Sequence, residues 1–536
     1  MRKSLRYKNL AVLVGAGSLM MAAAPLYAQP TQDESNQELN REVQELKEQV
    51  RQLKAQMGAQ QSAAQQPSAD SQKNAQAQAA GSKVVTVKDN TLSLGDLKVT
   101  LGGFMAAESV YRTRNQTADI ASDFKGYPFS NNPNYYTSEF RESARQSRLQ
   151  LLVQGPTDGL NKVEGFFAGD FLSSGTTSNQ NQSNSYTFRM REFYGDWVRT
   201  DWNAYALAGQ TWSMATLYKQ GLTPRAENIP LTIDASYVPG FTYARLSQLR
   251  LVKNFGDFAA VGLSLEEPEN LIKGSASCVA GGVSTGNCAT NPGNGGGLLN
   301  ATATYSTDVA PDVIVKAAVD PGFGHYELFS MTRFFRDRTK NTAFDNASNK
   351  TTVAQSFGGG MIIPIMPKLL EFQASGVIGE GNGRYGASTL GDSTVDRTDN
   401  SVVALKEQQL LLGLIGHPNP RLDLYLYGGR EHLESGENWG NGHASDNSGC
   451  EMNYNNIPVA GTPAVPTMGC SGAISTVGQL TGGFWWKFYK GSLGYLTTGM
   501  QGSYTKLDTY KDANGVQGHT NDTTVMLSFR YYPFAP

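Results

Sequence analysis

The sequence has few of the features that mark helical membrane proteins, nucleic-acid-binding proteins and metalloproteins. After residue 28 it contains no apolar run close to the roughly 20 residues that a membrane-spanning helix needs. Its charges nearly cancel, at -2 overall, so nucleic acid is not expected as a partner. Its five histidines and four cysteines lack the Cys-x-x-Cys or histidine spacing of a metal site, so neither a metal nor a cofactor is predicted.

The four cysteines form two pairs that are close in the sequence. Cys278 and Cys288 lie in one polar stretch rich in Gly and Asn, and Cys450 and Cys470 lie in another. In an oxidising compartment each pair can close as a disulfide and stiffen its loop. We therefore predict two loop disulfides. A metal site is the alternative that the spacing disfavours.

The N-terminus has the pattern of a secretory signal peptide. A basic segment from Arg2 to Lys8 precedes an apolar stretch from Leu10 to Pro25, and "LYAQ" follows. We expect cleavage after Ala28, so that residues 1–28 are removed. The alternative is a membrane anchor, but the apolar stretch is short for a span.

Residues 29–57 predict a short α-helical coiled coil. Apolar residues recur at alternating steps of four and three, with Leu at d and Val or Met at a, and Glu42 and Lys47 at the flanking positions can pair between helices. Valine at a with leucine at d favours dimers in isolated coils, so another interface would have to set a different oligomeric state. The predicted core residues are Leu39, Val43, Leu46, Val50, Leu53 and Met57.

Residues 58–82 have few large apolar side chains, which is typical of a flexible linker. From about Leu97 onward, short segments alternate apolar and polar side chains. In "RLQLLVQG", for example, Leu149 and Leu151 oppose Arg148 and Gln150. A period of two indicates half-buried β-strands. Gly makes up 58 of 536 residues, which suits a fold with many turns. We assign residues 83–536 to one all-β domain.

The connections between these segments alternate between short and long. Seven abrupt turns are predicted at 155–159, 199–203, 253–257, 320–324, 364–368, 417–420 and 489–492. Longer polar segments separate them at 112–142, 213–241, 268–310, 381–401 and 434–475. This alternation predicts an antiparallel transmembrane β-barrel of about 16 strands, with short turns at one end and long loops at the other. A water-soluble sandwich is the alternative fold.

Aromatic residues gather beside the short turns and at the C-terminus, as in the girdle of a barrel in lipid. The predicted girdle residues are Trp197, Trp202, Phe255, Phe258, Phe323, Tyr326, Trp485, Trp486, Tyr489, Tyr531, Tyr532 and Phe534.

If the apolar face meets lipid, the polar face lines a water-filled interior, where basic residues are frequent. A ring of guanidinium groups favours anions and binds carboxylates. The alternative is that carboxylates such as Glu108, Glu164, Asp170 and Asp423 neutralise these groups. The predicted pore-lining residues are Arg148, Arg189, Arg191, Arg250, Lys316, Arg333 and Arg430. The segment from Ser213 to Gly240, with Lys219 and Arg225, is predicted to fold inward as a constriction loop, partly by analogy with trimeric porins.

Several motifs together resemble the DcaP-like outer-membrane porins. They are the N-terminal heptads, "KVTLGGFMAAESVY", "GQTWS" at 209–213, "GEGNGRYG" at 379–386 and the terminal "LSFRYYPF". The resemblance implies a 16-stranded homotrimer in the outer membrane of a Gram-negative bacterium, with coils meeting in the periplasm. It also implies a basic constriction that admits small dicarboxylates and aromatic carboxylates, and it supports Arg148, Arg189, Arg191 and Arg250 as lumen residues.

The function that we predict is passive diffusion of small hydrophilic solutes, with a preference for anionic organic ones. The coil is also a candidate for contact with the cell wall. One alternative is a sugar-type or general porin, whose aromatic slide could use Phe104, Phe166, Tyr425 and Tyr427. An enzymatic barrel and an adhesin are further alternatives. No catalysis is expected, because the histidines lie in predicted turns or at strand ends without a Ser and Asp constellation.

Overall fold

The computed structural model divides the chain into two compact units, Met1–Lys83 and Val84–Pro536. The residues that it describes are 85–88, 90–173, 186–273, 304–339, 346–396, 398, 401–436, 439, 446–456, 470 and 472–534, together with 41, 44, 47–52, 54, 279–280, 283–284 and 293–294.

In the N-terminal unit, the described residues within 41–54 are helical, and the Val50 side chain is exposed. The signal peptide, the linker and the other five predicted core residues of the coil, Leu39, Val43, Leu46, Leu53 and Met57, lie outside the described residues. The coiled coil therefore stays a prediction. No described helix is long and apolar enough to cross a membrane.

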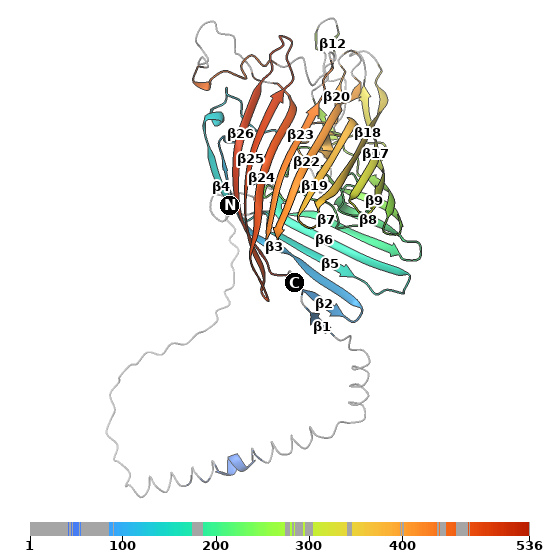
Figure 1. The fold of residues 1–536 in the computed structure, drawn as a ribbon, viewed down its shortest axis with the longest axis vertical. Helices are drawn as coiled ribbons and strands as arrows, with labels where there is room; N and C mark the ends of the chain where they lie inside the picture. Colours follow the sequence, from blue (N-terminus) through green and yellow to red (C-terminus); the bar gives the residue numbers. More distant parts are fainter. Residues whose placement is uncertain are drawn as a thin grey trace, which may run out of the picture. The chain divides into compact units, whose positions relative to one another are not determined.

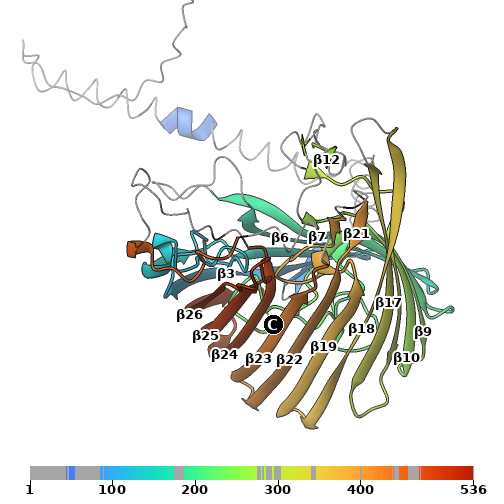
Figure 2. The ribbon, with the colours of Figure 1, turned by 90° about the horizontal axis from the view of Figure 1, so that it is seen from above.

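The second unit is an all-β barrel, as predicted. Its main sheet has 19 described strands, three of which lie outside the ring: β2 (Thr91–Leu94) and β4 (Glu139–Ser143) pair with β3, and β1 (Val85–Lys88) pairs with β2. The remaining 16 form a closed antiparallel ring, because the last strand, β26, pairs with β3. These are β3 (Leu97–Arg112), β5 (Arg148–Gln154), β6 (Asn161–Ser173), β7 (Thr187–Arg199), β8 (Ala204–Trp212), β9 (Arg245–Phe255), β10 (Ala259–Glu266), β16 (Asp312–Val319), β17 (His325–Thr339), β18 (Ser348–Met366), β19 (Leu370–Glu380), β22 (Lys406–Asn419), β23 (Leu422–Leu433), β24 (Ile474–Gly491), β25 (Gly494–Thr509) and β26 (His519–Tyr532). Figures 1 and 2 show them in sequence around the wall.

Short connections at one end and long connections at the other separate the strands, as the sequence predicts (Figure 1). The long connections carry small elements: β11 (Ile272–Lys273), β20 (Ser393–Val395) and β21 (Val402–Ala404) in one sheet, and the pairs β12 (Val279–Ala280) with β13 (Val283–Ser284) and β14 (Gly293–Asn294) with β15 (Thr304–Tyr305). They also carry the 3-10 helices η1 (Pro133–Tyr136), η2 (Gly383–Tyr385) and η3 (Tyr454–Asn456).

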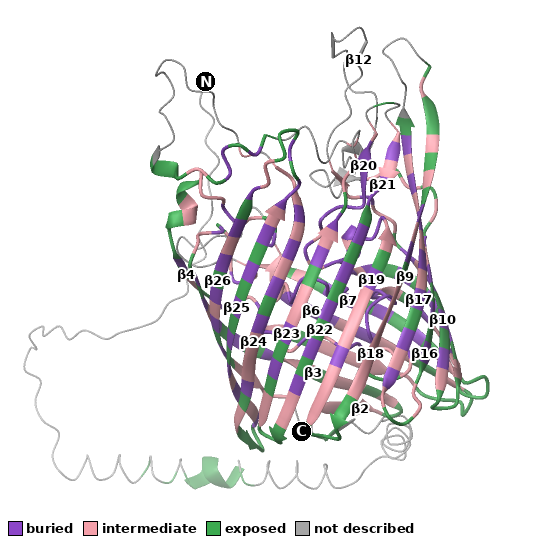
Figure 3. Ribbon diagram, turned by 45° about the horizontal axis from the view of Figure 1, so that its top comes forward, coloured by how far each residue is buried: buried purple, intermediate pink, exposed green. Residues whose placement is uncertain are grey.

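Along each strand, side chains alternate between a covered inner face and an exposed outer face, which gives the banded pattern of Figure 3. In β22, Leu410, Leu412 and Leu414 are exposed on the outer face, whereas Gln409 and Leu411 are buried inside. Because successive residues of a strand point to opposite faces, a period-two sequence must separate its side chains in this way.

The aromatic girdle is present on the outer face near the short turns, where Trp197, Trp202, Phe255, Phe258 and Phe323 are exposed. Two predicted members are wrong. Trp485 is buried inside the barrel, and Tyr532 lines an interior cavity. Each is adjacent in its strand to a residue on the outer face, Trp486 and Tyr531, and only one residue of such a pair can face outward.

We expect Leu426→Arg, on the outer face in the middle of β23, to lower the free energy of unfolding in lipid vesicles by about 2–4 kcal/mol. The reason is that the guanidinium would enter hydrocarbon. Equilibrium unfolding in urea measures this loss. Leu426→Ala is the control, since it removes apolar surface without adding charge. Equal losses in both variants would contradict the assignment of this face to lipid.

Candidate functional site

The connection between β8 and β9, residues 213–244, lies inside the barrel. Its apolar side chains are buried among those of the inner wall, notably Met214, Tyr218, Leu222, Ile233, Tyr237, Val238 and Phe241. This loop is the segment for which a constriction is predicted. We call it the inner loop.

One end of the inner loop is fixed to β16 and β17. The Lys316 ammonium donates hydrogen bonds to the carbonyls of Met214 and Thr216, at 3.0 and 2.7 Å, and pairs with Glu327 at 2.6 Å. Glu327 also accepts a hydrogen bond from the Tyr218 amide at 3.0 Å. A loop enclosed by a barrel has little water to satisfy its backbone, so wall side chains serve as its partners.

Arg250 fixes the same end from β9. Its guanidinium donates to the Trp212 carbonyl at 2.6 Å and to Gln248, and it contacts the Tyr218 hydroxyl. Arg250 and Lys316 face the interior as predicted, but the inner loop covers them completely. The prediction that they line the pore is therefore wrong, because a side chain needed by a covered backbone cannot also face open solvent.

The other end of the inner loop is fixed to β23, β24 and β25. The Trp485 indole donates to the Leu231 carbonyl at 2.7 Å, and the Leu231 amide donates to the Tyr427 hydroxyl at 3.2 Å. The Ile233 amide donates to Gln501 at 2.6 Å. The inner loop thus crosses between two walls and is hydrogen-bonded to both.

Two further predicted pore residues have other positions. Arg333 is buried and pairs with Asp312 at 2.8 Å and Asp392 at 2.6 Å, so it holds the 381–405 connection rather than lining open space. Arg430 lies on the outer face of β23, on the same side as Leu424 and Leu426, and is exposed. Its assignment to the lumen is wrong by one step of the strand alternation.

The two basic residues predicted for the inner loop differ in their contacts. Arg225 pairs with Glu164 at 2.7 Å and donates to the Tyr194 hydroxyl at 3.2 Å, which largely offsets its charge. The Lys219 side chain is exposed, and only its backbone amide is held, by the Ala226 carbonyl at 2.8 Å.

A cavity of about 370 Å³ remains between the inner loop and the wall formed by β3, β5 to β7 and β23 to β26. Its lining is mixed in charge and rich in aromatic rings. It includes four cationic side chains and three carboxylates, and Lys487 pairs with Asp423 at 2.9 Å. The cations are Arg148, Arg191, Lys487 and Arg530, and the carboxylates are Asp170, Asp234 and Asp423. We call this space the basic cavity.

Asp170 organises one side of the basic cavity. It pairs with Arg191 at 2.7 Å and accepts two hydrogen bonds from Arg189, at 3.0 and 2.9 Å. Arg148, directly across the β5–β6 ladder from Asp170, makes no ion pair among the described residues, and its buried Nε has no hydrogen-bond partner. One carboxylate is thus shared by two arginines, while a third arginine is left without one.

Tyr237 of the inner loop lies close to these arginines, and their positive charge changes the pKa of its hydroxyl. Its hydroxyl accepts a hydrogen bond from Arg191 at 3.3 Å. Burial by itself would raise the pKa of Tyr237, but the guanidinium charges of Arg191 and Arg148 outweigh burial and lower that pKa below its usual value. The loop side of the basic cavity therefore has a positive potential.

Sequence reasoning missed Arg530, which lies in the basic cavity. It donates to Glu108 at 2.9 Å and lies over the rings of Trp485 and Phe104, 4.5 and 4.7 Å from their centroids. The sequence could have indicated that Arg530 faces the interior, since it lies between Phe529 and Tyr531, which face outward.

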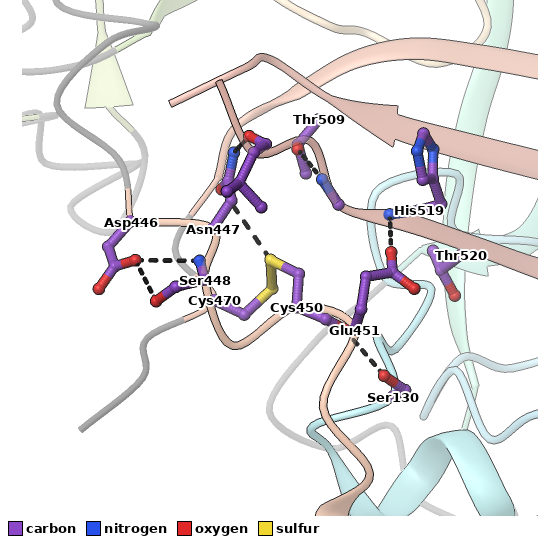
Figure 4. Close-up of a disulfide and its surroundings, with 12 residues drawn as sticks. Ser130, Asp446, Asn447, Ser448, Cys450, Glu451, Cys470, Thr509, His519 and Thr520 are labelled. Atoms are coloured by element: carbon purple, nitrogen blue, oxygen red, sulfur yellow. Dashed lines mark hydrogen bonds between the residues drawn. A yellow bond between two sulfur atoms is a disulfide. The ribbon is translucent and has the colours of Figure 1, made fainter. Parts of the chain in front are cut away.

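Within the described residues, no cluster of His, Cys, Asp and Glu could hold a metal ion. At the long-loop end, Cys450 and Cys470 form a disulfide, and the Cys450 carbonyl accepts a hydrogen bond from Ser130 at 2.9 Å (Figure 4). This joins the 434–473 connection to the 113–138 connection. The other predicted pair, Cys278 and Cys288, lies outside the described residues.

No family model matches the sequence, and no curated protein matches it. Among solved structures, the chain is similar to the outer membrane channel DcaP of Acinetobacter baumannii, with 17% identity over 84% of this chain and 100% of that one, and a TM-score of 0.55. It also matches an anion-selective porin from Comamonas acidovorans, with 12% identity, 81% and 99% coverage and a TM-score of 0.44. The first likeness confirms the predicted resemblance at the level of the fold.

We expect Gly240→Ala to release the inner loop. Gly240 has a φ of +87°, and a Cβ there would lie 2.1 Å from the Leu410 carbonyl oxygen, so the backbone would have to move. That movement would break the hydrogen bond from the Gly240 amide to Glu431, now 2.7 Å. Hydrogen-exchange mass spectrometry should show amides of the 230–244 segment exchanging at least tenfold faster.

Gly221→Ala is the matched control, because it lies in the same loop with nothing closer than 3.8 Å to the added Cβ. Unchanged exchange in Gly240→Ala would show that the inner loop does not depend on this contact.

Proposed function

We propose that this chain is an outer-membrane porin for passive diffusion of small hydrophilic solutes, with a preference for anionic organic solutes such as dicarboxylates. The closed 16-stranded barrel and its likeness to a structure described as an outer membrane channel support a diffusion pore. The preference rests on the basic cavity.

The observation that carries this preference is Arg148. It faces the basic cavity with no carboxylate partner among the described residues, and Arg191 and Arg530 line the same cavity. An arginine held in a partly dry site attracts anions more strongly than one in bulk water, and its planar group can bind a carboxylate at two points. A carboxylate solute would supply the counter-charge that the wall does not.

Transport also requires that a solute leave again. Asp170 and Asp423, which also line the basic cavity, would limit how tightly an anion is held. Conduction is favoured by sites that are attractive but weak, and mixed charge provides this. The inner loop would set the size limit, because it fills the opposite side of the barrel.

The second candidate is a sugar-type or general porin. It is favoured by aromatic rings at the basic cavity, where Tyr495 stacks on Tyr532 with centroids 4.3 Å apart and Tyr532 meets Phe104 at 5.2 Å. Such faces suit sugar rings as well as aromatic acids. Of the slide residues predicted from sequence, Phe104 lines the cavity, while Phe166, Tyr425 and Tyr427 pack against other side chains.

We further propose a homotrimer in the outer membrane of a Gram-negative bacterium, with residues 29–57 as a coil on the periplasmic side that can contact the cell wall. The domain limits are those predicted: signal peptide 1–28, coil 29–57, linker 58–82 and barrel 83–536. The outward girdle supports residence in lipid, and the heptads support association of the coils.

Arg148→Ala should reduce anion selectivity. In a planar bilayer under a KCl gradient, we expect the unaltered protein to show an anion-selective reversal potential and this variant to move it toward zero. Arg430→Ala is the control, since Arg430 is on the outer face, and it should leave the reversal potential unchanged.

Two results would contradict the anionic preference. One is a reversal potential near zero in the unaltered protein. The other is faster swelling of protein-containing liposomes in neutral sugars than in dicarboxylates of similar mass, which would favour the sugar-type porin.

Deleting residues 29–82 should weaken the trimer without unfolding the barrel, because the two units are separately compact. Native mass spectrometry in mild detergent would measure the trimer fraction, and heat-modifiable migration would report the folded barrel. A trimer as stable as that of the full chain would show that the coil does not hold the subunits together.

A further inference from the structure

The outer face of the barrel carries a groove between β7 and β10, near the short turns. Its volume is about 370 Å³, and its lining comes from five neighbouring strands and the β7–β8 turn. The floor is β8, whose outward side chains there are only Ala204 and Ala206. Trp197 of β7 and Leu251 of β9, both directly paired with Ala206, form its walls.

One strand step closer to the turns, two cations flank the same floor. Arg199 of β7 and Lys253 of β9 are each paired with Ala204. Adjacent strands are about 4.8 Å apart, so the two backbones are separated by roughly 10 Å with only a methyl group between them. This row lies at the level of the aromatic girdle, which marks the headgroup region of a bilayer.

Both cations are held in place but keep free donors. Arg199 donates to both carboxylate oxygens of Asp201, at 2.5 and 3.0 Å, and to Asn161 at 3.5 Å, which leaves two of its five N–H groups, and it lies 5.0 Å from the centre of the Trp202 ring. Lys253 donates to the Trp202 carbonyl and lies 5.9 Å from the centre of the Phe255 ring. With Asp201 counted, these groups carry one net positive charge, which matches the single negative charge of a phosphodiester.

We propose that this groove binds one glycerophospholipid, with the phosphate between Arg199 and Lys253 and an acyl chain along the alanine floor between Trp197 and Leu251. A lipid fits this surface better than a protein partner does, because the cations occur only at the girdle end and the rest of the lining is apolar. This site is separate from the lumen. It adds a fixed lipid to the proposed porin and does not depend on the selectivity of the pore.

The test is native mass spectrometry of the full-length protein, purified in mild detergent, freed of lipid and titrated with dioleoylphosphatidylglycerol or with dioleoylglycerol, which has the same chains without phosphate. We expect the phospholipid to bind at least tenfold more tightly. Arg199→Ala and Lys253→Ala should each weaken phospholipid binding about fivefold, and the double variant should bind both lipids equally.

Ala206→Trp, which fills the floor without changing charge, should weaken binding of both lipids. Arg430→Ala, an outward arginine outside this groove, should change neither. Heat-modifiable migration would confirm that each variant is a folded barrel.

Equal binding of the two lipids by the unaltered protein would overturn the phosphate site. If the Ala206→Trp variant bound both lipids as tightly as the unaltered protein, the proposal that the acyl chain lies in this groove would be overturned. If Ala206→Trp instead dissociated the oligomer and left lipid binding unchanged, the groove would be a contact between copies of this chain, which also overturns the proposal. Reversal potentials should be unchanged in all of these variants, so failure here is distinguishable from failure of the anion preference.

Discussion

The structure depends on the pairing of backbone polar groups in a place with little water. In hydrocarbon an unpaired amide or carbonyl is costly, so a sheet that crosses a bilayer must have no edge. The ladder from β26 to β3 meets this requirement by joining the last strand to the first. Everything else in the barrel follows from that closure, because it creates an inside and an outside and assigns every second side chain to each.

The same constraint explains the inner loop. Its irregular backbone cannot pair with itself as a strand does, and where it packs against the wall its amides and carbonyls are shielded from water. The loop therefore takes its partners from the wall, as Lys316 shows at one end and Trp485 at the other. This use of polar side chains has a consequence for charge. A cation that satisfies loop carbonyls is covered, so the basic residues left facing the cavity, Arg148 among them, are those that the loop does not need.

The outside of the barrel has the character expected of a surface that meets lipid. Apolar residues cover the middle of the strands, and aromatic rings with neighbouring cations mark the end near the turns. Where the outward side chains are small, as at Ala204 and Ala206, the surface is hollow, and this is where we propose a bound lipid. Inner and outer surfaces thus have different partners, although the same alternation produces both.

The sequence by itself determined the barrel, the approximate number of strands and the faces on which Leu149, Arg148 and Arg530 lie, because a period of two is a local property of the chain. The inward fold of the 213–240 segment was predicted partly by analogy with trimeric porins, so it does not follow from the sequence alone. The sequence also contained enough information to place Arg430, Trp485 and Tyr532 on the correct face of the barrel, since their faces follow from the same alternation. Only the tertiary structure decided which inward cations are free. Arg250 and Arg148 look equivalent along their strands, yet one is covered by a loop that starts beside it and the other faces the cavity, because their environment is made by segments distant in sequence.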